Sequence, residues 1–146
     1  MGHPYEYAFV VARILLAFVF LANGLGIVDQ TVAARELTEE GLPSRVVPLL
    51  MFASRSLELL AGIALGVGVF PQYAAAALLA FVVPATLISH SFWFAKNSEE
   101  RQRMLKGFAT NVAIWGGLIL VVVTPLQPSL INSFFLNSHL YAILTA

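Results

Sequence analysis

Long apolar segments separated by short polar ones make up most of the chain. The pattern predicts four membrane-spanning helices, because each apolar segment approaches the roughly 20 residues that cross a bilayer. A Phe-Pro-Gln break in the long uncharged run at the centre of the chain indicates a tight turn between two of them. We therefore predict an all-α fold, a polytopic four-helix membrane bundle that forms one domain over residues 1–146. The predicted spans are residues 7–28, 46–69, 73–94 and 108–124.

Polar residues concentrate in two connecting segments. The first, residues 29–45, contains either a short surface helix over 31–40 or an ordinary loop. The second, residues 96–106, is predicted to be a charged loop. The C-terminal segment, 129–146, is apolar but interrupted by Asn, Ser and His, which favours an interfacial or re-entrant helix over a fifth crossing. Because Lys and Arg gather in the two connecting segments, we predict that these are cytoplasmic and that both termini lie outside the cell membrane.

Composition excludes several functions. The chain is 59% hydrophobic and only 11% charged, as expected for a membrane protein. Its net charge is zero and it has no basic block, so we expect no nucleic-acid partner. It contains no cysteine, which excludes disulfides, thiol catalysis and thiolate metal sites within the chain. Any electrons that pass through the protein must therefore be carried by a bound cofactor or a partner.

Each predicted span carries a polar residue in its cytoplasmic half. Counting about 1.5 Å per residue from the span ends puts Arg13 and Glu58 at nearly the same depth. A charge near the bilayer centre costs at least about 2.5 kcal/mol, so ionisable groups on adjacent helices are expected to face one another. We therefore expect Glu58 to bridge Arg13 across helices and Arg55 one turn away on its own helix. The whole polar cluster comprises Arg13, Asn23, Arg55, Glu58, His90 and Asn111.

The cluster has two interpretations. It is either a structural salt bridge that keeps three helices in register, or a ligand pocket open to the cytoplasmic half. In the pocket, Glu58 would exchange a proton, and Arg13 and Arg55 would bind an anion, a lipid phosphate or a quinone oxygen. His90 is either a structural hydrogen-bonding residue or a second proton-exchanging group. Haem is disfavoured and no metal site is predicted, because the other two histidines fall on the opposite side of the predicted bundle.

Small residues predict close helix packing next to the cluster. Glu58, Gly62 and Gly66 recur at four-residue spacing, so they share one helix face and allow another backbone to approach it. The aromatic residues 92–94 at the end of the third span are expected to form an interfacial belt rather than a stacking platform for a cofactor.

The chain resembles the DoxX family of small four-helix membrane proteins. The resemblance lies in ARILLAFVFLANGLG, LELLAGIALGVG, SHSFWF and NVAIWGGLIL, in this order and spacing. It implies that close packing also occurs at Gly24, Gly116 and Gly117. The matching positions are Arg13, Gly24, Glu58, Gly62, His90, Asn111, Gly116 and Gly117.

The resemblance implies a membrane subunit of a quinone-linked or redox-stress oxidoreductase. The expected fold is also similar to that of vitamin K epoxide reductases, which use cysteines that this chain lacks, so electrons would come from a soluble redox partner docking at residues 96–106. His90, Asn111 or Asn23 would then contact the quinone while Glu58 exchanges the proton. Two alternatives remain: a small-anion or lipid binding and transport module that uses the arginine pair, or a non-catalytic membrane anchor for a soluble partner. Membrane lipid is an expected partner, and a homo-oligomer is compatible with the pattern.

Overall fold

A computed structural model describes residues 4–28, 31–39 and 41–124 of the chain. All the elements described are helical, which confirms the predicted all-α fold. Four of the helices, α1, α3, α4 and α5, are long and apolar enough to span a membrane. The predicted C-terminal helix over 129–146 lies outside the described residues. In chain order the elements are α1 (Pro4–Gly24), α2 (Thr31–Glu39), α3 (Val47–Val67), α4 (Pro71–Ser89), the 3₁₀ turn η1 (Phe92–Phe94) and α5 (Ser98–Val123).

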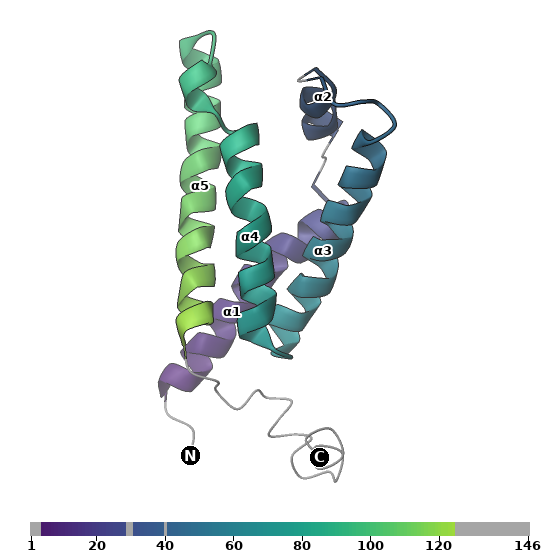
Figure 1. Cartoon of the computed structure of the whole chain (residues 1–146). Helices are drawn as coiled ribbons and strands as arrows, with labels where there is room; N and C mark the ends of the chain where they lie inside the picture. Colours follow the sequence, from purple (N-terminus) through teal and green to yellow (C-terminus); the bar gives the residue numbers. More distant parts are fainter. Residues whose placement is uncertain (1–3, 29–30, 40, 125–146) are drawn as a thin grey trace.

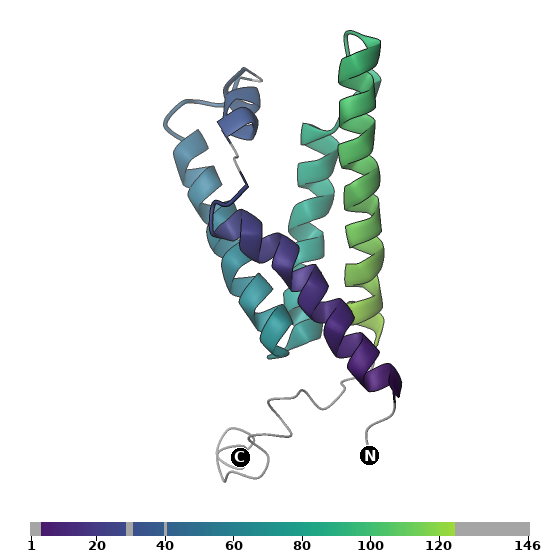
Figure 2. The same ribbon diagram turned by 180° about the vertical axis from the view of Figure 1, so that it is seen from behind.

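The spanning helices form two antiparallel pairs, α1 with α3 and α4 with α5 (Figure 1). Helix α1 crosses the other helices obliquely (Figure 2). Helices α3 and α4 are joined by a tight hairpin and diverge toward the end that carries α2. The apolar core joins the four spanning helices, and its members are Ala17, Phe20, Ala61, Leu65, Ala74, Ala75, Leu78, Val82, Leu118 and Val121.

The α3–α4 hairpin follows the predicted Phe-Pro-Gln turn, but α4 already begins at Pro71. Helix α3 ends with Gly68 in the left-handed region (φ 85°), and the Gly68 amide donates to the Ala64 carbonyl at 2.9 Å. Glycine reaches this conformation without the steric cost of a Cβ atom. Proline at the first position of α4 loses no hydrogen bond, because that amide has no partner within the helix. The hairpin is therefore built from residues suited to ending one helix and starting the next.

Helix α5 begins ten residues earlier than predicted, so most of the predicted charged loop over 96–106 is helical. The Asn97 side chain accepts a hydrogen bond from the Glu100 amide at 2.8 Å, and the Glu100 carboxylate accepts from the Lys96 amide at 2.8 Å. These two bonds cap the helix start, and Glu99 and Glu100 complement its dipole. At about 39 Å, α5 is longer than a bilayer core of about 30 Å. The hydropathy pattern predicted only the apolar part of α5, from residue 108 onward.

The other helix ends differ by smaller amounts. Helix α1 stops at Gly24 rather than at residue 28, because the chain turns at Gly26 (φ 74°) and the Ile27 amide reaches back to the Ala22 carbonyl at 3.0 Å. Of the two alternatives for the first connecting segment, the structure contains the short helix, α2. Helix α2 packs near the start of α3, where Val47 is buried.

Candidate functional site

The α1–α3 interface determines where the polar residues of these two helices meet. Gly24 lies against the backbone of α3: a Cβ atom on Gly24 would be only 2.8 Å from the Leu59 amide nitrogen. Closer to the hairpin, a Cβ atom on Gly66 would be 3.2 Å from the Ala17 Cβ. The helices therefore pack closely in one antiparallel register, with the end of α1 opposite the middle of α3.

This register separates Arg13 from Glu58. A Cβ atom on Gly68 would be 2.5 Å from Nη2 of Arg13, so the guanidinium lies at the end of α3, about 15 Å along the helix from Glu58. No salt bridge joins Arg13 to Glu58 in the described part of the chain. The expected Arg13–Glu58 bridge is therefore wrong. Counting residues from the span ends assumed that the ends of all spanning helices lie at the same height. In the structure α1 is oblique, and its end lies opposite the middle of α3.

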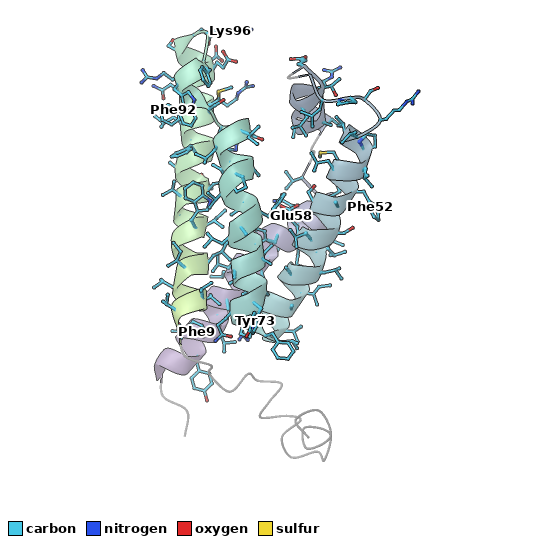
Figure 3. All side chains as sticks on the ribbon, viewed as in Figure 1. Phe9, Phe52, Glu58, Tyr73, Phe92 and Lys96 are labelled. Atoms are coloured by element: carbon cyan, nitrogen blue, oxygen red, sulfur yellow. The ribbon has the colours of Figure 1, made fainter. Side chains whose placement is uncertain are left out.

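Glu58 instead meets the end of α1. Its side chain is only 5% exposed, and its Oε1 accepts a hydrogen bond from Asn23 Nδ2 at 3.2 Å. Arg55 lies one turn earlier on α3, with Nη1 3.6 Å from the Cβ position of Gly26. Arg55 and Glu58 each have further interactions. We call Asn23, Arg55 and Glu58 the α1–α3 polar cluster; Figure 3 places Glu58 on α3 beside the end of α1, where α3 and α4 diverge.

The second helix pair holds the other predicted polar residues. Asn111 Nδ2 of α5 donates to Thr86 Oγ1 of α4 at 2.9 Å, and the Thr86 hydroxyl donates to the Val82 carbonyl at 2.6 Å. The His90 ring lies on α5 at Gly107, where a Cβ atom would be 2.7 Å from its Cε1. Asn111 and His90 therefore make these contacts within the α4–α5 pair and not with the α1–α3 polar cluster. The six predicted residues therefore contact different helix pairs instead of forming one four-helix cluster.

The aromatic residues after His90 pack η1 onto α5. The rings of Phe92 and Phe108 pack edge to face with their centroids 5.4 Å apart. The rings of Phe108 and Trp115 pack in the same way, with centroids 5.9 Å apart. Trp93 and Phe94 are 49% and 78% exposed, a degree of exposure that suits an interfacial belt. The aromatic residues therefore connect the exposed turn to the interior of the α4–α5 pair.

The predicted close-packing glycines differ in their surroundings. A Cβ atom on Gly62 would be 3.3 Å from the Phe20 Cβ, and one on Gly117 would be 2.9 Å from Leu16 Cδ1. Among the described residues, no atom outside the neighbouring backbone of α5 lies within 4 Å of the Cβ position of Gly116, so this part of the chain does not show the expected close packing there. Neighbouring residues of a helix point about 100° apart, and only Gly117 faces α1.

Sequence reasoning missed residues that complete these contacts. Thr86 is 1% exposed and is the partner of Asn111, and Gly107 provides the space for His90. Gly68 accommodates Arg13, and a glycine just after an apolar segment and just before a proline is a recognisable helix-end signal. No comparable signal pairs Thr86 with Asn111, because their contact depends on the register of two helices.

The α1–α3 polar cluster has the chemistry of a proton-exchanging ligand site. It combines a buried carboxyl group, an amide that donates to it and a guanidinium within one turn of α3. Within the ranges described, no group of three or more metal-binding side chains lies together. The cluster can therefore bind a carbonyl or an anionic oxygen and transfer a proton, using groups of this chain.

Comparison with known proteins identifies the family. A family model described as DoxX matches residues 8–91, more than half of the chain. The match includes α1 to α4 but not α5, so it includes the α1–α3 polar cluster and leaves Asn111, Gly116 and Gly117 outside. Comparisons with curated proteins and with solved structures give no match. The chain is a multi-pass membrane protein that belongs to the DoxX family.

Proposed function

We propose that the protein is the membrane subunit of a quinone-linked oxidoreductase system and that the α1–α3 polar cluster binds the quinone head group. One observation carries the proposal: the Glu58 carboxyl group is 5% exposed within an apolar spanning helix and receives a hydrogen bond from another helix. Ionisable residues inside membrane spans are costly and typically mark ligand or proton pathways.

The cost of burial is the first argument. An ionised carboxylate near the bilayer centre costs at least about 2.5 kcal/mol, whereas hydrogen bonds between helices in membranes contribute about 0.6 kcal/mol on average. The bond from Asn23, at 3.2 Å, offsets part of this cost, beside the further interactions of Glu58. A role in proton exchange would explain why the position holds a carboxyl group and not a neutral polar one, because a proton-exchanging group must take up and release a proton within the membrane.

The surroundings of the cluster supply the second argument. On α3, residues 48–53 are exposed except for the half-buried Met51, although they precede the cluster directly. The exposed side chains include Leu49 and Phe52, at 68% and 71%. An isoprenoid tail could lie along this apolar surface while its head group reaches Arg55 and Glu58. Most lipophilic-ligand sites combine an apolar lining with a few convergent polar groups in this way.

Reduction of a quinone to a quinol consumes two electrons and two protons. In the proposal, Glu58 delivers protons and is reprotonated from the aqueous side, while Asn23 and Arg55 hold the carbonyl oxygens. The chain has no cysteine, so its own thiols cannot supply the electrons, and in the proposal a soluble reductant supplies them. Its proposed docking surface is the first turns of α5, where Arg101, Gln102 and Arg103 are exposed.

The decisive experiment compares Glu58→Gln with Glu39→Gln, an identical change at an exposed position of α2. Each full-length protein is purified in mild detergent, its organic extract is analysed by absorbance and mass spectrometry, and the turnover of an added quinone is measured with a chemical reductant. We expect stoichiometric quinone and turnover in the wild type and in Glu39→Gln, and loss of turnover in a folded Glu58→Gln protein. An extract that contains only bulk lipid, or unchanged turnover in Glu58→Gln, would refute the proposal and favour a non-catalytic anchor.

The arginine-pair alternative loses its geometric basis. Arg13 lies beside Gly68 at one end of α3, whereas Arg55 lies beside Gly26 at the end of α1, so the two guanidinium groups do not form one site. Arg13 therefore requires a separate explanation.

A further inference from the structure

Arg13 is a buried residue for whose Nε the described residues provide no acceptor. The residue is 2% exposed, and its Nε has no hydrogen-bond partner in the part of the chain that is described. No salt bridge reaches it there either. An ionised group held out of water without a partner is strongly unfavourable, so a binding partner for this guanidinium is expected.

The position of Arg13 indicates what kind of partner fits. Its guanidinium lies against Gly68, three residues before α4 begins at Pro71. The first amides of a helix have no acceptor within the helix, and no side chain caps the start of α4. The amides of Gln72 and Tyr73 therefore have no acceptor within α4, and they lie only four and five residues along the chain from Gly68, where the guanidinium lies. Helix N-termini and guanidinium groups both favour oxyanions, and a guanidinium binds phosphate oxygens in a bidentate manner.

The turn also carries the aromatic residues that are typical of a membrane interface. Phe70 and Tyr73 flank the start of α4 and are 71% and 76% exposed, as expected for aromatic residues at a membrane interface. Gln72 adds a second unsatisfied group: its Nε2 donates to the Thr124 carbonyl at 3.1 Å, while its Oε1 is buried without a partner among the described residues. A head group that carries both phosphate oxygens and a hydroxyl or ammonium group would satisfy the donor and the acceptor together.

We propose that Arg13 and the N-terminus of α4 bind a phosphate group at the α3–α4 turn. The inference does not depend on the quinone site, since it uses different residues at the opposite end of the α1–α3 pair. The competing explanation is that Arg13 only caps the carbonyl end of α3, where cations are favourable. A cap needs no ligand, and this difference makes the two explanations separable.

The test measures thermal unfolding and native mass spectra of the full chain in mild detergent at constant ionic strength. The probes are short-chain phosphatidylglycerol, inorganic phosphate and short-chain diacylglycerol, which lacks the phosphate. We expect stabilisation by the phospholipid and none by diacylglycerol; stabilisation by inorganic phosphate as well would identify free phosphate as a sufficient ligand.

Three variants locate the effect. Arg13→Gln should abolish the stabilisation, and Arg13→Lys should weaken the apparent affinity about tenfold, equivalent to one charge-assisted hydrogen bond. Arg45→Gln, at an exposed position before α3, removes the same charge elsewhere and should change nothing. If Arg13→Gln does not fold, the wild type and Arg13→Lys still decide. A wild type that no phosphate compound stabilises, or an Arg13→Lys protein that binds as the wild type does, would show that Arg13 is only a helix cap.

Discussion

Replacing Gly24 by alanine tests the register on which the α1–α3 polar cluster depends. The new Cβ atom would lie 2.8 Å from the Leu59 nitrogen and 2.9 Å from its Cα, about 0.6 Å short of ordinary contact. Because these are backbone atoms of α3, no side-chain rotation relieves the clash, and the two helices must move apart. Overpacking of this kind costs about 1–3 kcal/mol, against a gain of about 0.4–1 kcal/mol from replacing glycine in the unfolded chain. We therefore expect a net loss of about 1–2 kcal/mol in the free energy of unfolding.

The matched control is Gly116→Ala, where no atom from the described residues outside the neighbouring backbone of α5 lies within 4 Å of the Cβ position. The same chemical change should there be neutral or stabilise the protein by up to about 1 kcal/mol, through helix propensity. The free energies of unfolding are compared by titration from mild detergent into a denaturing one. A Gly24→Ala protein as stable as the wild type, or an equal loss in Gly116→Ala, would contradict the close approach of α1 and α3 at this position.

Two further predictions concern the α4–α5 pair. Thr86→Val removes the acceptor of the Asn111 amide inside the bundle and should lower the free energy of unfolding by about 1 kcal/mol, whereas Thr110→Val, at an exposed position, should have little effect in the same assay. Asn97→Ala removes the cap of α5 and should cost about 1 kcal/mol, most of it local; hydrogen exchange should then accelerate in the first turn of α5 and remain unchanged near the hairpin.

The sequence was sufficient to predict the four spanning helices. A spanning helix is recognised from the apolar composition of its own segment, and this composition does not depend on which other helices the segment packs against. The sequence predicted the ends of these helices less well. The extra turns of α5 contain Glu99, Arg101 and Arg103, which hydropathy treats as loop, although Asn97 followed by Glu100 is a recognisable capping pattern.

For the candidate site, the sequence predicted which polar residues are at least partly buried but not which of them are in contact. Glu58 is buried as expected for an ionisable residue within a span, and it meets another helix. On α1, the residue that donates to Glu58 is Asn23 rather than Arg13, because the oblique path of α1 determines which residues are opposite each other (Figure 2). Residue counting contains no information about helix tilt, which depends on packing against neighbours. The spacing of Gly62 and Gly66, by contrast, identified the α3 face that α1 approaches.

The division of polar contacts between helix pairs bears on where a ligand can bind. Asn23 meets Glu58 within one pair, and Asn111 meets Thr86 within the other. Packing between the pairs rests on the apolar core, whose fully buried leucines, Leu65, Leu78 and Leu118, come from α3, α4 and α5. Glu58 of the α1–α3 polar cluster lies beside the space where α3 and α4 diverge (Figure 3). A lipophilic ligand that binds there would add apolar contacts between the pairs without displacing the leucines that hold them together. The close approach of α1 and α3 at Gly24, next to Asn23 and Glu58, equally suits a structural role for their hydrogen bond, and the Glu58→Gln comparison separates this role from the proposed ligand site.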